Sequence, residues 1–209
     1  MTRAYQSRVL KKSVSPMCRK CHRMPETTGH ILSHCESHFW TLYKERHDQG
    51  LGVLYYHLCR KLGLKVFKPW KSIPAVQETD RARLMWDVSL STDRALVHRR
   101  PDITLTLKES KTTLLLEMAC CYDSLIEERQ KEKQQKYEEL VADLALQFPG
   151  NKVKSVPLVI GDLGSIGNQA KSLESTKLFT PKEWEAVLCS MQTRVLYSST
   201  RILKRHLSG

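Results

Sequence analysis

The stretch HRRPDITLTLKESKTTLLLEMACCYDSLIEERQKEKQQKYEEL, residues 98–140, decides the fold. It contains two short runs of β-strand character, residues 102–107 and 112–118, with a polar turn between them. If these runs pair as an antiparallel hairpin, Asp102 at the start of the first lies near Glu117 at the end of the second. The sequence therefore predicts two carboxylates side by side at one end of a sheet.

Two adjacent carboxylates repel each other, and one takes up a proton unless a cation lies between them. A divalent metal is the simplest reason to keep both acids, and Mg²⁺ favours oxygen ligands. Asp102 and Glu117 would then bind Mg²⁺, together with the main-chain carbonyl of Met118. The alternative is a solvated sheet end that carries two unrelated acids, because isolated acid pairs are common.

A long amphipathic helix is predicted to follow, from residue 124 to residue 148. Its apolar positions recur every 3.6 residues, and the same stripe traced backwards from Tyr137 reaches Lys133, which should face the sheet. A lysine on such a stripe is favoured where its ammonium approaches carboxylates or a phosphate. The alternative is that the stem of Lys133 packs while its charge reaches water. Lys136 lies beside the stripe and is expected to face solvent or phosphate.

The composition limits the class of protein. With 209 residues, 41% of them hydrophobic, the chain can bury one core and a small satellite. The net charge of +12 indicates a polyanionic partner, with nucleic acid as the first choice. No run of about 18 apolar residues occurs, so we expect no membrane partner, and no secretory signal is recognisable. In the reducing compartment that this implies, the seven cysteines are expected to be metal ligands or buried thiols.

A zinc site is predicted near the N-terminus. The spacing C-x2-C-x8-H-x4-C provides two short clips of the kind that a tetrahedral zinc site requires, formed by Cys18, Cys21, His30 and Cys35. Four ligands leave no open position, so the expected role of the zinc is structural. His22 or His34 could replace His30 without violating zinc chemistry.

Residues 36–63 are predicted to form two helices, with a break near Gly50. The string Arg46-His47-Asp48 stands just before this break. Asp48 could cap the second helix while His47 packs against it. Alternatively, Arg46 and His47 contact nucleic acid.

The rest of the chain supplies the other elements of a mixed sheet with helices. Residues 83–91 and 96–107 are predicted to be strands around a turn, and residues 153–160 a short apolar strand. Thr180 is the expected cap of a final helix with proline in its first turn. Residues 204–206 are expected to be a basic tail.

The hairpin and the following helix resemble the core of the P-D-(D/E)-x-K nucleases. The string Arg-Pro-Asp ending at Asp102 matches the first element, and Glu117 stands for the second acid. The lysine that normally follows two residues later is replaced by Ala119. Some branches of that superfamily supply the lysine from the next helix, and residues 132–137, EKQQKY, look like that arrangement.

The order of features also resembles the C-terminal part of site-specific non-LTR retrotransposon polyproteins, the R-two type that inserts into ribosomal RNA genes. The matching features are the C-x2-C-x8-H-x4-C cluster, then RHD, RRPDITL, LLLEMA and a lysine-rich helix ending in KY. The resemblance implies an endonuclease that nicks target DNA to prime reverse transcription. It further implies DNA and element RNA as partners, a nuclear location, and a reverse transcriptase upstream that this chain lacks.

Together these features predict a mixed α/β fold: a restriction-endonuclease-like core, preceded by a small zinc-binding helical module. The expected parts are a basic linker (1–16), the zinc module with its helices (17–65) and the endonuclease domain (66–209). Asp102 and Glu117 would hold Mg²⁺, and Lys133 would steady the attacking hydroxide or the phosphate. Groups expected to hold the nucleic acid backbone are Arg46, His47, Arg99, Arg100 and Lys136. The competing hypothesis is an inactive, zinc-stabilised nucleic-acid-binding module derived from such an element.

Overall fold

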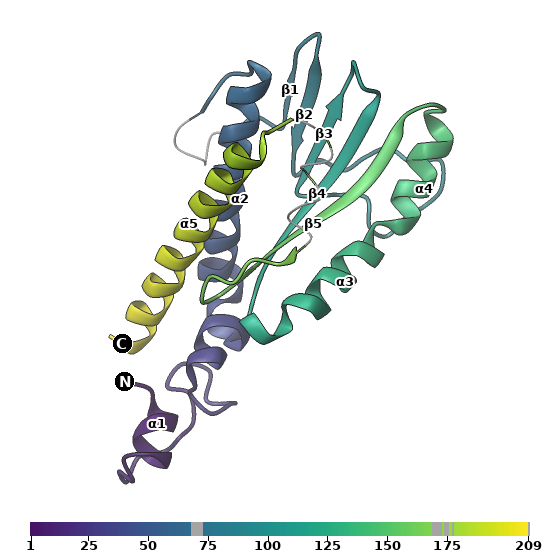
Figure 1. Cartoon of the computed structure of the whole chain (residues 1–209). Coiled ribbons are helices and arrows are strands. Elements are labelled where there is room, and N and C mark those ends of the chain that lie inside the picture. The colour runs from purple at the N-terminus through teal and green to yellow at the C-terminus, as the bar shows by residue number, and fades with distance from the viewer. Residues whose placement is uncertain (68–72, 169–172, 174–175, 177, 209) are drawn as a thin grey trace.

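The predicted hairpin lies in the middle of a sheet with strand order β1-β2-β3-β4-β5 (Figure 1). The structure, a computed structural model, describes residues 1–67, 73–168, 173, 176 and 178–208. Neighbouring strands are antiparallel except β4 and β5, which are parallel. The strands are β1 (Val76–Glu78), β2 (Ala82–Trp86), β3 (Ile103–Leu107), β4 (Thr112–Cys121) and β5 (Lys152–Gly161).

Helices cover both faces of this sheet, so the predicted mixed α/β class is confirmed. Helices α2 and α5 lie side by side on one face, and α3 and α4 cover the other (Figure 1). Their bounds are α1 (Arg3–Arg8), α2 (Lys44–Leu62), α3 (Ile126–Lys136), α4 (Glu138–Gln147) and α5 (Pro181–Leu207). Short helical turns are η1 (His30–His34), η2 (Glu36–His38), η3 (Phe39–Tyr43) and η5 (Asp123–Leu125). Among the described residues, no helix has the length and apolar character needed to cross a bilayer.

The hairpin has the predicted register. Ile103 pairs with Leu116, and Leu107 pairs with Thr112 across the four-residue turn. Because side chains alternate along a strand, one face of β4 carries Leu114, Leu116 and Met118, and these pack with α2 and α5. The opposite face carries Leu115, which packs with Tyr137, Leu140 and Leu144. Glu117 shares this second face and is thereby directed toward α3.

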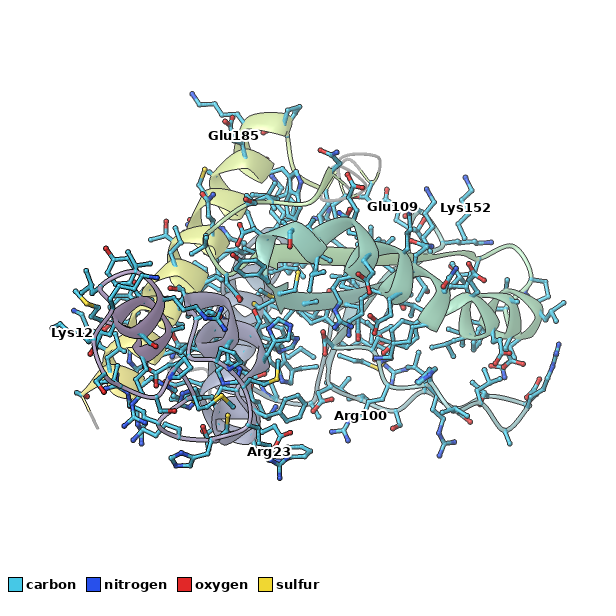
Figure 2. The ribbon with its side chains drawn as sticks, turned by 90° about the horizontal axis from the view of Figure 1, so that it is seen from below. Lys12, Arg23, Arg100, Glu109, Lys152 and Glu185 are labelled. Carbon is cyan, nitrogen blue, oxygen red and sulfur yellow. The ribbon has the colours of Figure 1, made fainter. Side chains whose placement is uncertain are left out.

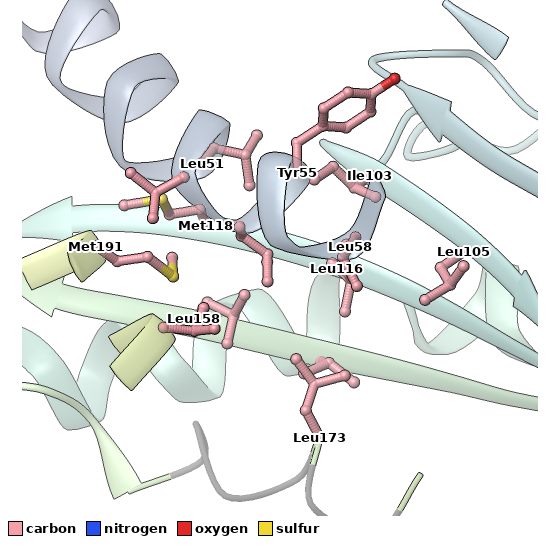
Figure 3. Close-up of a cluster of buried hydrophobic side chains, with 14 of the residues drawn as sticks. Leu51, Tyr55, Leu58, Ile103, Leu105, Leu116, Met118, Leu158, Leu173 and Met191 are labelled. Atoms are coloured by element: carbon pink, nitrogen blue, oxygen red, sulfur yellow. The ribbon is translucent and has the colours of Figure 1, made fainter. Parts of the chain in front are cut away.

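The main core lies between the sheet and the helix pair α2 and α5 (Figure 3). The residues labelled in Figure 3 come from α2, three strands, the segment before α5, and α5 itself: Leu51, Tyr55, Leu58, Ile103, Leu105, Leu116, Met118, Leu158, Leu173 and Met191. Helix α2 therefore belongs to the same core as the sheet.

The core predicts a large effect for a central leucine. Leu116 is fully buried, so Leu116→Ala should lower the free energy of unfolding by about 2–5 kcal/mol, through lost burial and the cavity left behind. Leu146, which is 68% exposed on α4, provides the matched control, and Leu146→Ala should change the stability by less than about 0.5 kcal/mol. Urea denaturation of the two variants measures both values. Equal losses would contradict this placement of the core.

The predicted helix break near Gly50 is wrong, because α2 continues through this residue to Leu62. A Cβ atom at Gly50 would lie 2.4 Å from Cε of Met118 and 3.1 Å from Val195. The glycine thus allows α2 to approach β4 and α5 closely. The helix ends instead at Gly63, whose φ of +67° is the left-handed cap conformation.

The strand prediction for residues 83–91 and 96–107 is correct only in part. Residues Ala82 to Trp86 pair with Leu107 to Ile103, and a long connection spans residues 87–102. The sheet pairing stops at Asp87, which has a φ of +52° and whose main-chain N–H donates to the carbonyl of Asp102. Such a conformation is unfavourable within a strand.

The predicted helix over residues 124–148 is divided at Tyr137. This residue has φ −112° and ψ 12°, and it separates α3 from α4. Its ring is fully buried between the helices and the sheet. The division lets α3 follow the end of β4 that carries Glu117 while α4 packs on Leu115.

Candidate functional site

The structure brings the two predicted carboxylates together. Asp102 immediately precedes β3, and the hairpin register places it beside Glu117 of β4. The main-chain N–H of Asp102 donates to Oε2 of Glu117 at 3.3 Å, and the N–H of Met118 donates to Oδ2 of Asp102 at 2.7 Å. These cross-strand contacts fix both side chains at the same end of the hairpin.

Two lysines of α3 reach the buried carboxylate of Glu117. Nζ of Lys133 lies 2.8 Å and Nζ of Lys136 lies 2.6 Å from the same oxygen, Oε1. Residues three apart share a helix face, so both ammonium groups point at the sheet. The prediction for Lys133 is therefore confirmed in its orientation. Lys136 was expected to be solvated or to face phosphate; its ammonium instead contacts Glu117, and contact with phosphate stays a prediction.

Tyr137 completes the surroundings of Glu117. Its hydroxyl lies 3.0 Å from Oε2 of Glu117 and 2.9 Å from the carbonyl oxygen of Arg100. Burial, together with the neighbouring charge of Glu117, raises the pKa of Tyr137 well above its ordinary value, so the hydroxyl remains a donor. Helical periodicity predicts this tyrosine on an apolar stripe but does not predict the contact of its hydroxyl with Glu117. Because Tyr137 directly follows Lys136 in the sequence, its hydroxyl could have been expected near the same carboxylate.

His47 approaches Asp102 from α2. Its Nε2 lies 3.0 Å from Oδ2 of Asp102, and its Nδ1 lies 3.0 Å from Oδ1 of Asp48. Burial alone would lower the pKa of His47, but the hydrogen bonds to the two carboxylates outweigh it and raise the pKa to about 10. The same contact keeps the pKa of Asp102 below its usual value, although burial acts in the opposite direction. Because α2 is continuous, Asp48 caps no second helix here.

Both carboxylates of this site have cationic partners without an added ion. His47, Lys133 and Lys136 are cations beside two carboxylates, so a metal is no longer the simplest reason for keeping both acids ionised. The donor set nevertheless fits Mg²⁺, which binds one or two carboxylates and retains waters. Within the described residues, Oδ1 of Asp102 accepts no hydrogen bond, so one hard oxygen donor is available.

Asp102, Glu117, Lys133 and His47 line a groove with a volume of about 500 Å³, here called the carboxylate groove. Its more exposed lining residues, here called the rim, are Phe39, Trp40, Lys44 and Arg129. A larger hollow of about 680 Å³ lies beside the end of α5, but no carboxylate lines it. The carboxylate groove is the candidate for metal-dependent chemistry because Asp102 and Glu117 lie side by side in its lining.

The basic residues predicted to contact nucleic acid have different environments. Arg46 is 1% exposed, and its Nη1 lies 2.7 Å from Oδ1 of Asp162 and 3.3 Å from Oγ of Ser199. It holds α2 to the end of β5 and to α5, so the prediction that it contacts nucleic acid is wrong. Arg99 and Arg100 are exposed, and Figure 2 shows Arg100 at the outer surface. Nucleic acid contact by these two residues, and by His47, stays a prediction.

The predicted zinc ligands come together near the N-terminus and could hold a metal such as zinc. Their ligand atoms lie within 4.8 Å of one another: Cys18, Cys21, His30 and Cys35. The Sγ atoms of Cys18 and Cys35 are 3.8 Å apart, and Sγ of Cys21 lies 3.3 Å from Nε2 of His30. Separations of this size suit a tetrahedral zinc with bonds of about 2.0–2.3 Å. Of the histidines considered, His30 joins the cluster, and His22 and His34 do not.

The end of α5 reaches this cluster, a contact that was not predicted from the sequence. His206 was expected in a basic tail, but it is fully buried, with Nε2 3.7 Å from Sγ of Cys18 and 3.2 Å from Oε2 of Glu26. Its Nδ1 lies 2.8 Å from Nε2 of His38. Continuing the apolar stripe of α5 through Ile202 would have placed His206 on the buried face.

The N-terminal segment also packs on the zinc cluster. The predicted linker contains α1, whose Ala4 is buried and whose Arg3 donates its main-chain N–H to Glu26 at 2.9 Å. Burial of Glu26 favours its neutral form, but hydrogen bonds led by Arg19 outweigh this effect and lower its pKa to about 2. Glu26 is thus an ionised, fully paired anion that joins α1, the zinc cluster and α5.

The comparisons with known proteins are sparse. No family model and no curated protein matches this sequence. Among solved structures, an N-terminal domain of a reptarenavirus L protein is similar, with a TM-score of 0.37 and 15% identity over 76% of this chain and 77% of that chain. A likeness at this level supports no assignment of function.

Proposed function

We propose that this protein is a metal-dependent DNA endonuclease with a P-D-(D/E)-x-K type of active site. The observation that carries the proposal is the convergence on Glu117 of Asp102 from the hairpin and of Lys133 and Lys136 from the next helix. Acids of this kind with a nearby lysine provide both a metal site and a cation for phosphate chemistry.

The residues can be given roles in phosphodiester hydrolysis. Asp102 and Glu117 would hold Mg²⁺ with the carbonyl of Met118, and the ion would polarise the scissile phosphate and lower the pKa of a bound water. Lys133 and Lys136 would stabilise the hydroxide or the developing negative charge on the phosphate. Since both ammonium groups contact the same oxygen of Glu117, Lys136 is as good a candidate for the catalytic lysine as Lys133.

Two further residues would position the acids. Tyr137 holds Oε2 of Glu117, which leaves Oε1 for the lysines. His47 contacts Oδ2 of Asp102, so that Oδ1 of Asp102 would be available to bind the metal. Each catalytic carboxylate therefore has one oxygen restrained by a neighbouring side chain, an arrangement that favours preorganisation.

The biological setting is part of the same proposal. The order of the zinc cluster, RHD, RPD, the second acid and the KY helix supports an origin in a site-specific non-LTR retrotransposon. The endonuclease would nick nuclear target DNA so that an upstream reverse transcriptase can prime on it, with element RNA as a second partner. The net charge of +12 supports a polyanionic substrate.

One observation favours the competing function, an inactive nucleic-acid-binding module. The carboxylates are neutralised by His47, Lys133 and Lys136, so the pair is stable without Mg²⁺. A site that had lost its metal would retain this arrangement. Nicking activity separates the two functions.

The deciding experiment is nicking of supercoiled plasmid in Mg²⁺ or Mn²⁺, with a reaction that lacks both ions as the blank. We expect Asp102→Asn to lower the nicking rate by about 100-fold, because the variant removes a charged metal ligand. Glu109→Gln in the exposed turn between β3 and β4 is the matched control and should nick like the parent. Equal nicking by the parent and Asp102→Asn would refute the proposal. DNA binding by the parent without nicking would favour the inactive module.

A further inference from the structure

We propose that Phe39 and Trp40, on the rim of the carboxylate groove, form a stacking site for an unpaired nucleobase. The substrate of the proposed endonuclease would then be DNA that is single-stranded or locally unpaired at the cleavage site. This inference rests on the proposed function and names its substrate class. Phe39 and Trp40 line the groove but have no role in the hydrolysis proposed above.

The two rings are exposed, whereas large aromatic side chains are usually mostly buried. Trp40 is 82% exposed and Phe39 is 57% exposed, and their ring centroids are 4.9 Å apart in an edge-to-face contact. The other tryptophans that the structure describes behave differently: Trp184 is buried in the core, and Trp86 packs edge-on against Tyr55. The exposed indole face of Trp40 therefore adds little to the stability of the fold.

The helix that carries Trp40 also carries a residue of the catalytic site. η3 continues directly into α2, and Trp40, Lys44 and His47 follow the spacing i, i+4, i+7 of one helix face. All three side chains line the carboxylate groove, and His47 contacts Asp102. A chain segment bound over Asp102 and Glu117 would therefore reach the indole ring within the same groove.

The rim also supplies positive charges for a phosphate backbone. The side chains of Lys44 and Arg129 are 64% and 42% exposed and line the groove from two helices, α2 and α3. Each also has an acidic neighbour on its own helix, Asp48 and Glu132, so these cations are held in place. Aromatic rings beside cations are the combination that binds single strands, because every base offers a π-face and every nucleotide a phosphate.

The geometry favours an unpaired base over a duplex. Within a duplex both faces of each base are covered by neighbouring bases, so a protein ring can stack only on a nucleotide that is unpaired or turned out. A rim of this kind thus selects DNA by its strandedness and tolerates many sequences.

The test is binding of one labelled DNA sequence, as a single strand and as a duplex, to the full chain with its zinc retained, in buffer without Mg²⁺ or Mn²⁺. Trp40→Ala should weaken single-strand binding by about 5- to 150-fold, the equivalent of about 1–3 kcal/mol for one stacked base, and change duplex binding little. Trp40→Phe should retain most of the affinity because it retains a stacking face. Tyr197→Ala is the matched control, since Tyr197 is a 57% exposed aromatic residue on α5 outside the groove.

The outcomes separate this inference from the proposed function. Unchanged single-strand affinity in Trp40→Ala, or an equal loss for duplex, overturns the stacking site while leaving the nicking result untouched. Conversely, a selective loss for single strands supports the stacking site even if Asp102→Asn nicks like the parent and the proposed function falls. A single-stranded RNA of the same sequence forms the third arm, and a loss confined to RNA would overturn the assignment to DNA.

Discussion

Removing both lysines that contact Glu117 should abolish nicking far more completely than removing either one. We expect Lys133→Ala and Lys136→Ala each to lower the nicking rate by about 10-fold, and the double variant by about 1,000-fold. The reason is geometric, since the two ammonium groups lie 2.8 and 2.6 Å from the same carboxylate oxygen. Either one can stabilise charge at that position when the other is absent. Rates on saturating plasmid measure the effect.

The control for this experiment is Lys131→Ala, on the exposed face of the same helix, which should nick at the parental rate. Because Glu117 is nearly inaccessible to solvent, loss of both cations also raises the free energy of its ionised form. Thermal denaturation of the double variant must therefore show a folded protein before its rate is interpreted. A double variant that is folded and cuts like Lys133→Ala would show that only one lysine serves the site.

Only Lys133 was predicted to face the sheet, but in the structure both Lys133 and Lys136 contact Glu117. Helical periodicity placed Lys133 toward the sheet correctly, because periodicity is local and α3 obeys it. The same argument placed Lys136 outside, because it assumed one straight helix to residue 148. The real helix ends at Lys136, and the conformation of Tyr137 redirects the chain. A break set by tertiary packing leaves no strong mark in a sequence without proline or glycine at that point.

The hairpin and its acid pair could be predicted because they depend on local sequence alone. A four-residue turn between two alternating runs fixes the register, and the register alone brings Asp102 to Glu117. His47 was predicted either to pack at a helix end or to contact nucleic acid, and its contact with Asp102 was not predicted. Its contact with Asp102 depends on how α2 crosses the end of the sheet, 55 residues away in the chain. Arg46 shows the same limit, since its burial against Asp162 follows from that crossing.

Zinc removal should have the largest effect on stability, because the binding free energy of a structural zinc is also folding free energy. Apparent values for small zinc modules are about 10–16 kcal/mol, more than the stability of most domains. We expect one equivalent of zinc in the purified protein, and loss of zinc in Cys18→Ser/Cys21→Ser. Cys189→Ser is the matched control, since this cysteine is exposed on α5 and should leave the zinc content unchanged.

The consequences of zinc loss should extend beyond the zinc cluster itself. His206 at the end of α5 lies 3.7 Å from Sγ of Cys18 and is hydrogen bonded with His38, so the last turn of the helix depends on the cluster for its packing. The middle of α5, where Met191 and Val195 are buried against the sheet and α2, has an independent support in the main core. Amide hydrogen exchange after chelation should therefore accelerate in residues 18–38 and in the last turn of α5 before it does so near Met191. Exchange that stays slow in that last turn while zinc is lost would contradict the coupling, and a zinc content below half an equivalent in the parent would contradict the site.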